Sequence, residues 1–348
     1  MLAGFLHGSR DVRIRAIPCP TPQRAEVLLR VRRVGICGSD IHYYQHGRCG
    51  AFVPTRPFIL GHEFVGVVEE LGAEVDRFVI GDRVVANPAT SCGQCESCKS
   101  GRANLCPFVV MLGSANTTPP TNGAFAEYVV IAEHQCHRLT DEVTDAVAAL
   151  TEPLSVALHA IHRADGVSGK QVLIAGAGPI GATIAVAARA YGASLIVISE
   201  PNDCRRGMAL NLGIEHTLDP EERAFVDQAI MLSGGGFDIA FEASGAVPAV
   251  RQCFDVVCRG GSIVQIGTVR GNGVALPVND LMTREISLIG TFRYSDEFAE
   301  AIRLLFARRV QLDQLITATF PLQELPQAME TACNSNDSIK VQVVAGER

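Results

Sequence analysis

A glycine motif between two apolar runs restricts the fold of this chain more than any other feature. Gly176, Gly178 and Gly181 follow the run QVLIA, and the next apolar run, SLIVIS, ends directly before Glu200. A strand, a glycine-rich turn and a helix in this order place backbone N–H groups at the helix start, where they favour a pyrophosphate. The motif therefore predicts a βαβ unit that binds a dinucleotide.

The hydrophobic pattern changes near residue 150. Before it, short β-rich runs at residues 26–34, 63–71, 83–86 and 126–131 predict a compact β domain. After it, apolar runs alternate with helical stretches near residues 179–191, 202–212 and 247–258, the rhythm of a doubly wound parallel sheet. The fold class is α/β. The tail differs, because residues 298–306 have helical spacing and KVQVVAG predicts a strand, so we expect it to return to the first domain.

Composition favours an intracellular enzyme. The 348 residues are 47% hydrophobic, enough for two domains with separate cores. Twelve cysteines and a start, MLAGFLHGSRDVRIRA, without an apolar segment of signal length predict a reducing, cytoplasmic location. No apolar run reaches membrane-spanning length. The net charge is −7 and the basic residues are scattered, so the sequence predicts no basic surface for nucleic acid. We expect neither a membrane nor a nucleic acid as partner.

Glu200 favours NAD over NADP. It lies nineteen residues after Gly181, at the end of the second strand, where a carboxylate accepts hydrogen bonds from the adenosine ribose. The same carboxylate would repel a 2′-phosphate. Arg205 and Arg206 leave the alternative open, because a guanidinium there could pair with a 2′-phosphate, stack on adenine or lie in solvent.

One short loop, around residues 90–108, holds four cysteines in the pattern C-x2-C-x2-C-x7-C. They are Cys92, Cys95, Cys98 and Cys106. Thiolates at this spacing can close a tetrahedral site around Zn²⁺, and a site with no open position is structural. Free buried thiols or two disulfides are the alternatives. The loop is too polar for a core, and disulfides between neighbours would close loops of two residues. We expect this lobe to fold only with zinc bound.

A second metal site is predicted from residues far apart in the sequence. Cys37 lies in GICGSD, His62 and Glu63 lie in GHE, and Glu152 lies in TEPLS. Alone, such a cysteine is more often a buried thiol and such a glutamate a solvated charge. Together they offer sulfur, imidazole and carboxylate, the ligand set of a catalytic zinc with an open fourth position.

Six segments in this order resemble the zinc-dependent medium-chain alcohol and polyol dehydrogenases over essentially the whole chain. They are GICGSDIHYYQHGRCGAF, LGHEFVGVV, the cysteine loop, TEPLSVALHA, GAGPIG and GTFRYSDEF. The resemblance implies a GroES-like β domain, residues 1–153 and 291–348, interrupted by a Rossmann domain, residues 154–290. It also implies a homo-oligomer, either a tetramer or a dimer.

Within the family the chain is similar to the sorbitol dehydrogenase branch, and to its idonate-oxidising members in particular. The resemblance makes Cys37 and His62 zinc ligands, with Glu63 or Glu152 completing the shell directly or through water. It implies substrate contacts at Tyr43, Phe52, Glu152, Arg293 and Tyr294, and a proton path at Ser39 and His42. Cofactor contacts are implied at Gly176, Gly178, Pro179, Ile180, Gly181, Glu200, Arg205, Gly267, Thr291, Phe292 and Arg293.

The implied reaction is oxidation of a secondary hydroxyl of a sugar acid, with hydride transfer to NAD. The preferred candidate is the oxidation of L-idonate to 5-keto-D-gluconate. Zinc would lower the pKa of the hydroxyl, Ser39 and His42 would relay the proton, and Arg293 would pair the substrate carboxylate. A neutral polyol is the alternative substrate. A zinc-free quinone reductase of this fold would lack part of the Cys37, His62 and Glu152 set. A non-catalytic NAD-binding protein would show no turnover.

Overall fold

The computed structural model describes residues 1–269, 273–334 and 336–346, and its contacts divide the chain into two compact units. Unit 1 is Met1–Glu152, Phe298–Arg308 and Ile316–Arg348, and unit 2 is Pro153–Glu297 and Arg309–Leu315. The second segment of unit 1 begins at Phe298, and the sequence predicted the domain boundary at residue 291. Glu297 Oε1 lies 2.8 Å from His159 Nδ1 of helix α4 (Thr151–Arg163), which ties the preceding residues to unit 2. Residues 335, 347 and 348 of the predicted first domain lie outside the described residues.

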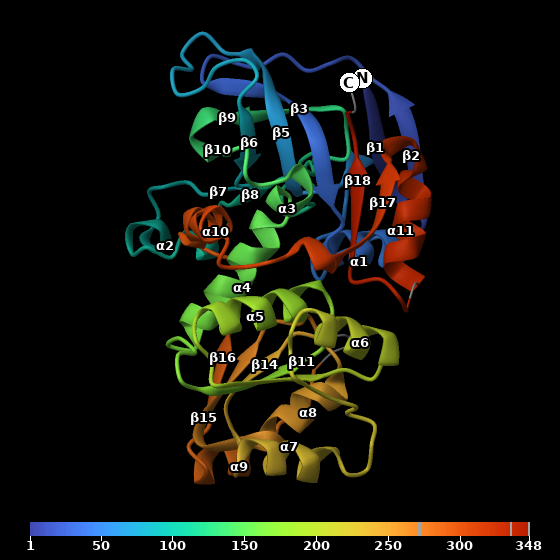
Figure 1. Cartoon of the computed structure of the whole chain (residues 1–348). Helices are drawn as coiled ribbons and strands as arrows, with labels where there is room; N and C mark the ends of the chain where they lie inside the picture. Colours follow the sequence, from blue (N-terminus) through green and yellow to red (C-terminus); the bar gives the residue numbers. More distant parts are fainter. Residues whose placement is uncertain (270–272, 335, 347–348) are drawn as a thin grey trace. The chain divides into compact units, whose positions relative to one another are not determined.

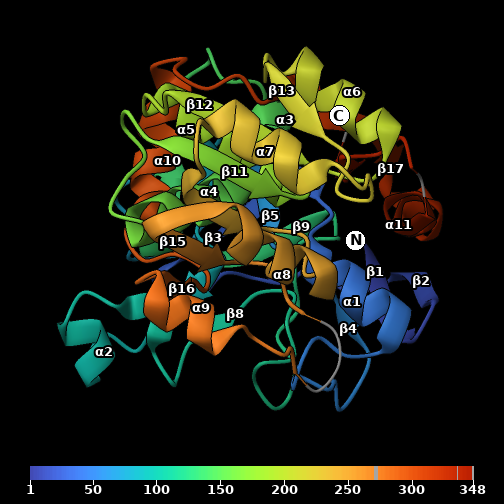
Figure 2. The same cartoon turned by 90° about the horizontal axis from the view of Figure 1, so that it is seen from below.

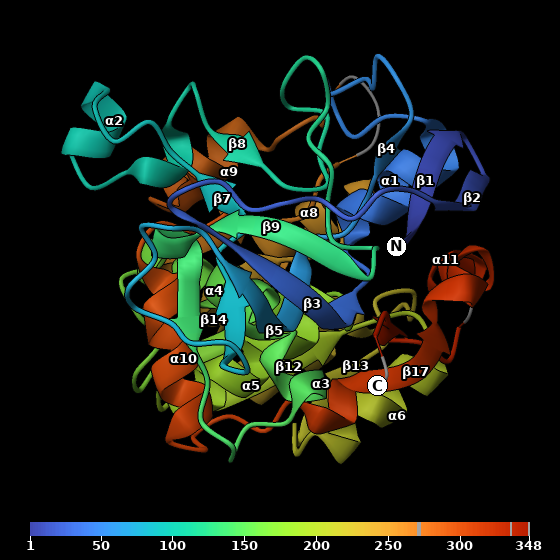
Figure 3. The same ribbon diagram turned by 90° about the horizontal axis from the view of Figure 1, so that it is seen from above.

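The main sheet of unit 1 collects strands from both ends of the chain. Its order is β10 (Cys136–Arg138), β6 (Arg83–Ala86), β5 (Glu63–Leu71), β3 (Glu26–Gly35), β18 (Lys340–Val344) and β17 (Ile316–Pro321). Strand β9 (Tyr128–Ala132) also pairs with β3, and Figure 3 shows it lying beside that strand. Because β18 pairs antiparallel with β3, the C-terminal strand returns to the first unit, as its apolar pattern predicts.

A smaller sheet and several helices complete unit 1. The sheet runs β2 (Asp11–Ala16), β1 (Leu2–Gly8), β4 (Phe58–Ile59). The helices are α1 (Gly38–His46), α3 (Asp145–Ala148), α10 (Glu297–Phe306) and α11 (Leu325–Asn334). Alternate residues of β3, among them Val27, Leu29 and Val31, are fully buried in the core of this unit. The cysteine lobe, with β7 (Ala89–Thr90), α2 (Glu96–Lys99) and β8 (Val110–Met111), projects from it in Figure 3.

In the residues that the structure describes, unit 2 is built on six parallel strands. Their order is β13 (His216–Leu218), β12 (Leu195–Ser199), β11 (Gln171–Ala175), β14 (Phe237–Glu242), β15 (Val257–Gln265) and β16 (Ser287–Gly290). The chain runs outward from β11 to β13 and then outward from β14 to β16, so the order reverses between β11 and β14. In an open parallel sheet, ligands bind outside the carboxyl ends of the strands at such a reversal.

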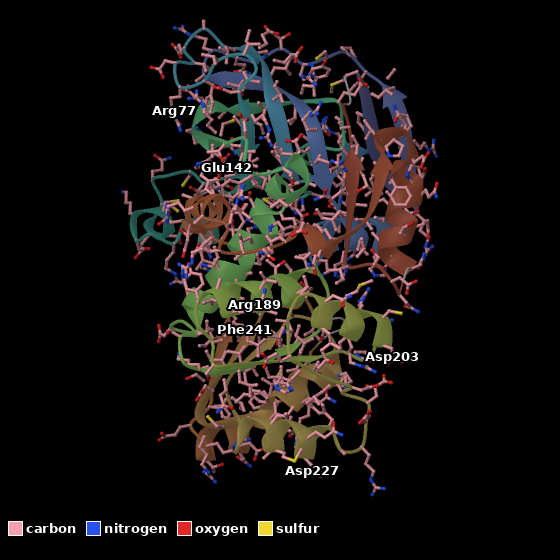
Figure 4. The ribbon with its side chains drawn as sticks, viewed as in Figure 1. Arg77, Glu142, Arg189, Asp203, Asp227 and Phe241 are labelled. Atoms are coloured by element: carbon pink, nitrogen blue, oxygen red, sulfur yellow. The ribbon has the colours of Figure 1, made fainter. Side chains whose placement is uncertain are left out.

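Helices cover both faces of this sheet. Figure 1 shows α5 (Pro179–Ala190) and α6 (Asp203–Asn211) on one face, and α7 (Phe225–Ser233), α8 (Val247–Val256) and α9 (Val278–Thr283) on the other. Figure 2 follows the strands from β13, near α6, to β16, near α9. Central strands are therefore apolar on both sides, and Phe241 of β14 is fully buried while Asp227 of α7 points outward (Figure 4).

Among the described residues, no helix combines the length and the apolar character that a membrane crossing requires.

Candidate zinc and dinucleotide sites

The three motif glycines have distinct steric roles at the end of β11. Gly176 has φ +103°, and a Cβ there would lie 3.0 Å from the Cβ of Ser244. A Cβ on Gly181 would overlap the carbonyl oxygen of Gly176, because helix and strand approach closely. Gly178 faces open space directly before Pro179, the first residue of α5. The turn is thus tight at its two ends and open in its middle, where a pyrophosphate would approach.

Glu200 is buried and fastened to this turn. Its Oε2 accepts a hydrogen bond of 2.8 Å from the N–H of Ala177, and its Oε1 accepts one of 3.1 Å from Asn202. Arg206 donates to the carbonyl of Glu200 and pairs with Asp219 at 3.2 Å, so its guanidinium is already bound within the unit. Carboxylate oxygens have further lone pairs, so Glu200 can still accept from a ribose.

Arg205 differs from its neighbour Arg206. Its Nε is buried, and among the described residues it has no hydrogen-bond partner. Arg205 therefore has a buried donor, Nε, that could bind a group in the site.

The carboxyl ends of β14, β15 and β16 add residues to the same edge. Glu242, the last residue of β14, is fully buried and accepts hydrogen bonds of 2.9 Å from the N–H groups of Ser244 and Gly245. A Cβ on Gly267 would overlap the N of Gly245 and lie 2.7 Å from Glu242 Oε2. Thr291 Oγ1 is buried and has no partner in the described part of the chain. Sequence reasoning missed Glu242, although a carboxylate closing an apolar strand before Ser-Gly could have drawn attention to it.

The four lobe cysteines form one cluster. Each offers a sulfur within 4.8 Å of the others. The Sγ of Cys98 lies 3.4 Å from that of Cys95 and 3.9 Å from that of Cys92, near the roughly 3.8 Å that tetrahedral Zn–S bonds of about 2.3 Å require. These separations exceed an S–S bond, and all four are free thiols, so the disulfide alternative is excluded.

Backbone groups prepare the lobe for a cation. N–H groups of Gln94 and Cys95 lower the pKa of Cys92 to about 6, which favours its thiolate. The Sγ of Cys106 accepts from the N–H groups of Cys92 and Phe108, each at 3.4 Å. The donor set fits zinc.

The second predicted metal site assembles at the end of β3. Cys37 precedes α1, while His62 and Glu63 stand at the start of β5. Each of the three offers a ligand atom within 4.8 Å of the others, and His62 and Glu63 are buried. Glu152 of α4 is buried as well, but it does not belong to this group of converging ligand atoms.

The site gathers several buried ionisable side chains. Asp40, which sequence reasoning missed, is completely buried, accepts hydrogen bonds from the N–H groups of Cys37 and Gly61, and places Oδ1 3.9 Å from His62 Nδ1. Burial alone would lower the pKa of His62, but the charges of Cys37 and Asp40 raise it well above its ordinary value. Burial raises the pKa of Glu152 to about 7. His62 Nδ1 is buried without a hydrogen-bond partner in the described chain, so this donor set fits a bound cation.

The remaining predicted residues occupy three settings. Ser39 and His42 lie half-buried, one turn apart on α1. Tyr43 is buried in unit 1, where its hydroxyl oxygen accepts from the N–H of Ala115 at 2.9 Å, and Phe52 is half-buried in the same unit. Tyr43 therefore anchors the loop at residues 113–116.

Arg293 and Tyr294 belong to unit 2. Arg293 has a left-handed backbone, with φ +54°, and its guanidinium lies 4.7 Å from the centre of the Phe292 ring. Tyr294 is buried, whereas Phe292 is half exposed.

Comparison with known proteins decides the family. Residues 23–141 match the model of the alcohol dehydrogenase GroES-like domain, and residues 179–307 match that of the zinc-binding dehydrogenases. The chain belongs to the zinc-binding dehydrogenase family. It is an oxidoreductase with a GroES-like domain and a Rossmann domain, as its motifs predict.

Several known proteins align with this dehydrogenase over almost its whole length. Sorbitol dehydrogenase of Bacillus subtilis is 36% identical, over 99% of this chain and 97% of that protein. The crystal structure of L-idonate 5-dehydrogenase from Escherichia coli matches with a TM-score of 0.90 and 32% identity, over 99% of this chain and 97% of the other. A putative zinc-binding dehydrogenase from Sinorhizobium meliloti, bound to NADP, matches with a TM-score of 0.90 and 30% identity, over 99% and 98%.

Proposed function

We propose that this dehydrogenase oxidises a secondary hydroxyl of a sugar acid, L-idonate to 5-keto-D-gluconate, and passes the hydride to NAD. The convergence of Cys37, His62 and Glu63 within 4.8 Å carries the proposal, because these donors suit a catalytic zinc and come from distant parts of the sequence. The similarity to L-idonate 5-dehydrogenase of Escherichia coli supports the sugar-acid substrate.

Glu63 is the proposed third ligand. Its ligand atom lies within 4.8 Å of those of Cys37 and His62, and Glu152 is outside that group. The proposed role of Glu152 is to contact the substrate, because a buried carboxyl group can donate a hydrogen bond to the substrate hydroxyl or accept one from it.

The chain supplies binding, orientation and a proton route. A zinc ion held by Cys37, His62 and Glu63 would lower the pKa of the substrate hydroxyl, and a bound nicotinamide would take up the hydride. Ser39 and His42, one turn apart on α1, form the proposed route for the released proton, because a hydroxyl both donates and accepts and an imidazole titrates near neutrality. Arg293 is the proposed partner of the substrate carboxylate, since a guanidinium can bind a carboxylate through two hydrogen bonds.

NAD is the proposed dinucleotide. Glu200, held by the N–H of Ala177 at the end of β12, would accept from the ribose hydroxyls and repel a 2′-phosphate. NADP is the competing cofactor, since a similar protein from Sinorhizobium meliloti is bound to it.

The first experiment compares kcat/KM of the zinc-loaded enzyme with NAD for L-idonate and for D-sorbitol. We expect L-idonate to be preferred by about 100-fold, roughly 2.7 kcal/mol of transition-state discrimination. A preference for sorbitol would replace the sugar acid by a neutral polyol, the substrate class named for the Bacillus subtilis relative. Dinucleotide binding without NADH formation from either substrate would indicate a non-catalytic protein.

Cys37→Ser tests the metal site separately. We expect one zinc fewer per chain and no turnover, with an unchanged circular dichroism spectrum, because the serine oxygen is a poorer zinc ligand than a thiolate. A variant that keeps both zinc ions and its activity would refute the catalytic site.

A further inference from the structure

Glu63 has a buried cationic partner that no motif predicts. Lys340, the first residue of β18, forms an ion pair through Nζ with Glu63 Oε2, and both side chains are 1% exposed. Its Nζ also donates a hydrogen bond of 2.9 Å to the carbonyl of Ile36, next to Cys37. A strand from the C-terminal end of the chain therefore contributes to the site formed by α1 and β5.

The sheet leaves room for this pair at Gly35. Gly35 of β3 pairs with Glu63 of β5 on one side and with Gln342 of β18 on the other. A Cβ on Gly35 would overlap Glu63 Oε2 and lie 2.9 Å from Lys340 Cε. The backbone of Gly35 is not left-handed, so no backbone strain calls for glycine there. The missing side chain instead provides the space in which carboxylate and ammonium meet.

Stability alone does not account for a fully buried ion pair. Removing two charges from water costs several kcal/mol per ion, and an apolar pair of similar volume is often as stable. The surroundings do explain a cation at this position, because the acidic side chains of Glu63, Cys37 and Glu152 all interact favourably with the ammonium of Lys340. The lysine therefore balances the acidic groups that the fold gathers at the proposed metal site.

We propose that Lys340 is a positioning residue for the catalytic zinc: it holds one oxygen of Glu63 and leaves the other directed to the metal beside Cys37 and His62. The inference rests on the proposed function, because it takes this group of ligands to bind zinc. Lys340 touches a ligand and not the metal, and residues in that relation to a metal site typically change affinity 10- to 100-fold when removed.

Two variants disturb the pair in different ways. Lys340→Met removes the charge and keeps much of the volume, and Gly35→Ala displaces both side chains without removing a charge. We expect each to weaken binding of one of two zinc ions by about 10- to 100-fold in chelator competition. The visible spectrum of the cobalt-substituted protein should also change, because it reports the geometry of the ligand shell.

Matched controls separate positioning from general damage. Val343→Ala removes a fully buried side chain from the same strand, and Gly8→Ala adds a Cβ to a strand glycine with open space around it. Val343→Ala should lower the unfolding temperature, and both should keep wild-type zinc affinity and cobalt spectrum. Lys340→Arg, which retains the charge, should recover part of the affinity lost in Lys340→Met.

Cys37→Ser, measured in parallel, distinguishes the two possible failures. If Cys37→Ser keeps both zinc ions, the proposed metal site is wrong and the role of Lys340 falls with it. If Cys37→Ser loses one zinc but Lys340→Met and Gly35→Ala bind zinc as the wild type does, only the positioning role is overturned. If Lys340→Met does not fold, Gly35→Ala and Lys340→Arg decide the outcome by the same two readouts.

Discussion

Replacing Glu242 by alanine should destabilise the carboxyl ends of the strands in unit 2, where the dinucleotide is proposed to bind. The carboxylate is fully buried at the end of β14 and accepts hydrogen bonds of 2.9 Å from the N–H groups of Ser244 and Gly245. It also accepts from Gln265, which ties β14 to β15. Ser244 lies against Gly176, because a Cβ on that glycine would come within 3.0 Å of the serine Cβ. Glu242 thus supports the turn that precedes α5.

The structure gives the size of the effect. Glu242→Ala leaves the buried N–H of Gly245 without an acceptor, at roughly 1–3 kcal/mol, and also the part-buried N–H of Ser244, at a smaller cost because water can reach it. A domain of this size loses about 2–4 °C in unfolding temperature per kcal/mol, so we expect a decrease of at least about 2 °C. If Ser244 and Gly245 must then be ordered by the cofactor at about 1 kcal/mol each, NADH affinity falls roughly 30-fold.

Thermal unfolding followed by circular dichroism and NADH titration by calorimetry measure the two effects. Glu242→Gln keeps the volume, and its amide oxygen can still accept from both N–H groups, so its losses of stability and NADH affinity should be smaller than those of Glu242→Ala. Some loss is expected, because its amide nitrogen then faces the donor of Gln265. Glu215→Ala removes an exposed glutamate of the same unit and should change neither value. A Glu242→Ala protein that binds NADH within twofold of wild type and unfolds within 1 °C of it would refute the reasoning.

Three further predictions concern the lobe, the cofactor and pH. Cys95→Ser should lose one zinc per chain by mass spectrometry and unfold at lower temperature, since the lobe depends on the S4 site; full zinc content with unchanged stability would contradict its structural role. Glu200→Gln should raise the ratio of kcat/KM with NADP to that with NAD by at least about 10-fold, or 1.4 kcal/mol, and an unchanged ratio would remove Glu200 from cofactor selection. Burial would raise the pKa of Glu297, but hydrogen bonds with His159 and His162 outweigh it and lower this pKa. The ionised Glu297 therefore stabilises the fold above its ordinary pKa of 4.5, and this stabilisation is lost as the pH falls below that value. Glu297→Gln should have a lower unfolding temperature than the wild type at pH 7, and the two unfolding temperatures should converge as the pH falls below 4.5. A difference in unfolding temperature that stays constant with pH would argue against the pairing.

Long apolar runs allowed several elements to be predicted from the sequence. The strands at residues 63–71 and 83–86 have the predicted bounds, and the helix expected at residues 179–191 is α5, Pro179–Ala190. Strands β1, β2 and β13 and helices α7 and α11 were not predicted. Such elements lack a long period of their own, and pairing or packing within their unit stabilises them.

Local spacing determined the two motifs whose residues are close in sequence. The lobe cysteines and the glycine turn need only a few consecutive residues to form, so their pattern shows both the geometry and the chemistry. Cys37, His62, Glu63 and Glu152 were predicted as a set from the ligand chemistry of their side chains, and the family resemblance added their roles as zinc ligands. The choice of Glu63 as the carboxylate that converges with Cys37 and His62 came from the tertiary structure.

Tertiary structure alone revealed Asp40, Glu242 and Lys340. A lone charged residue in a sequence predicts an exposed charge, and no spacing distinguishes Asp40 or Lys340 from the other charged residues. The position of Glu242 at the end of an apolar run was a signal in the sequence, but only the structure showed its hydrogen bonds. Strand pairing decides that Lys340 of β18 lies across Gly35 from Glu63, although 276 residues separate the two charges in the chain. The sequence thus determined which donors could bind zinc and a dinucleotide. The fold decided which buried charges hold those donors in place, because burial and cross-strand register exist only in the folded chain.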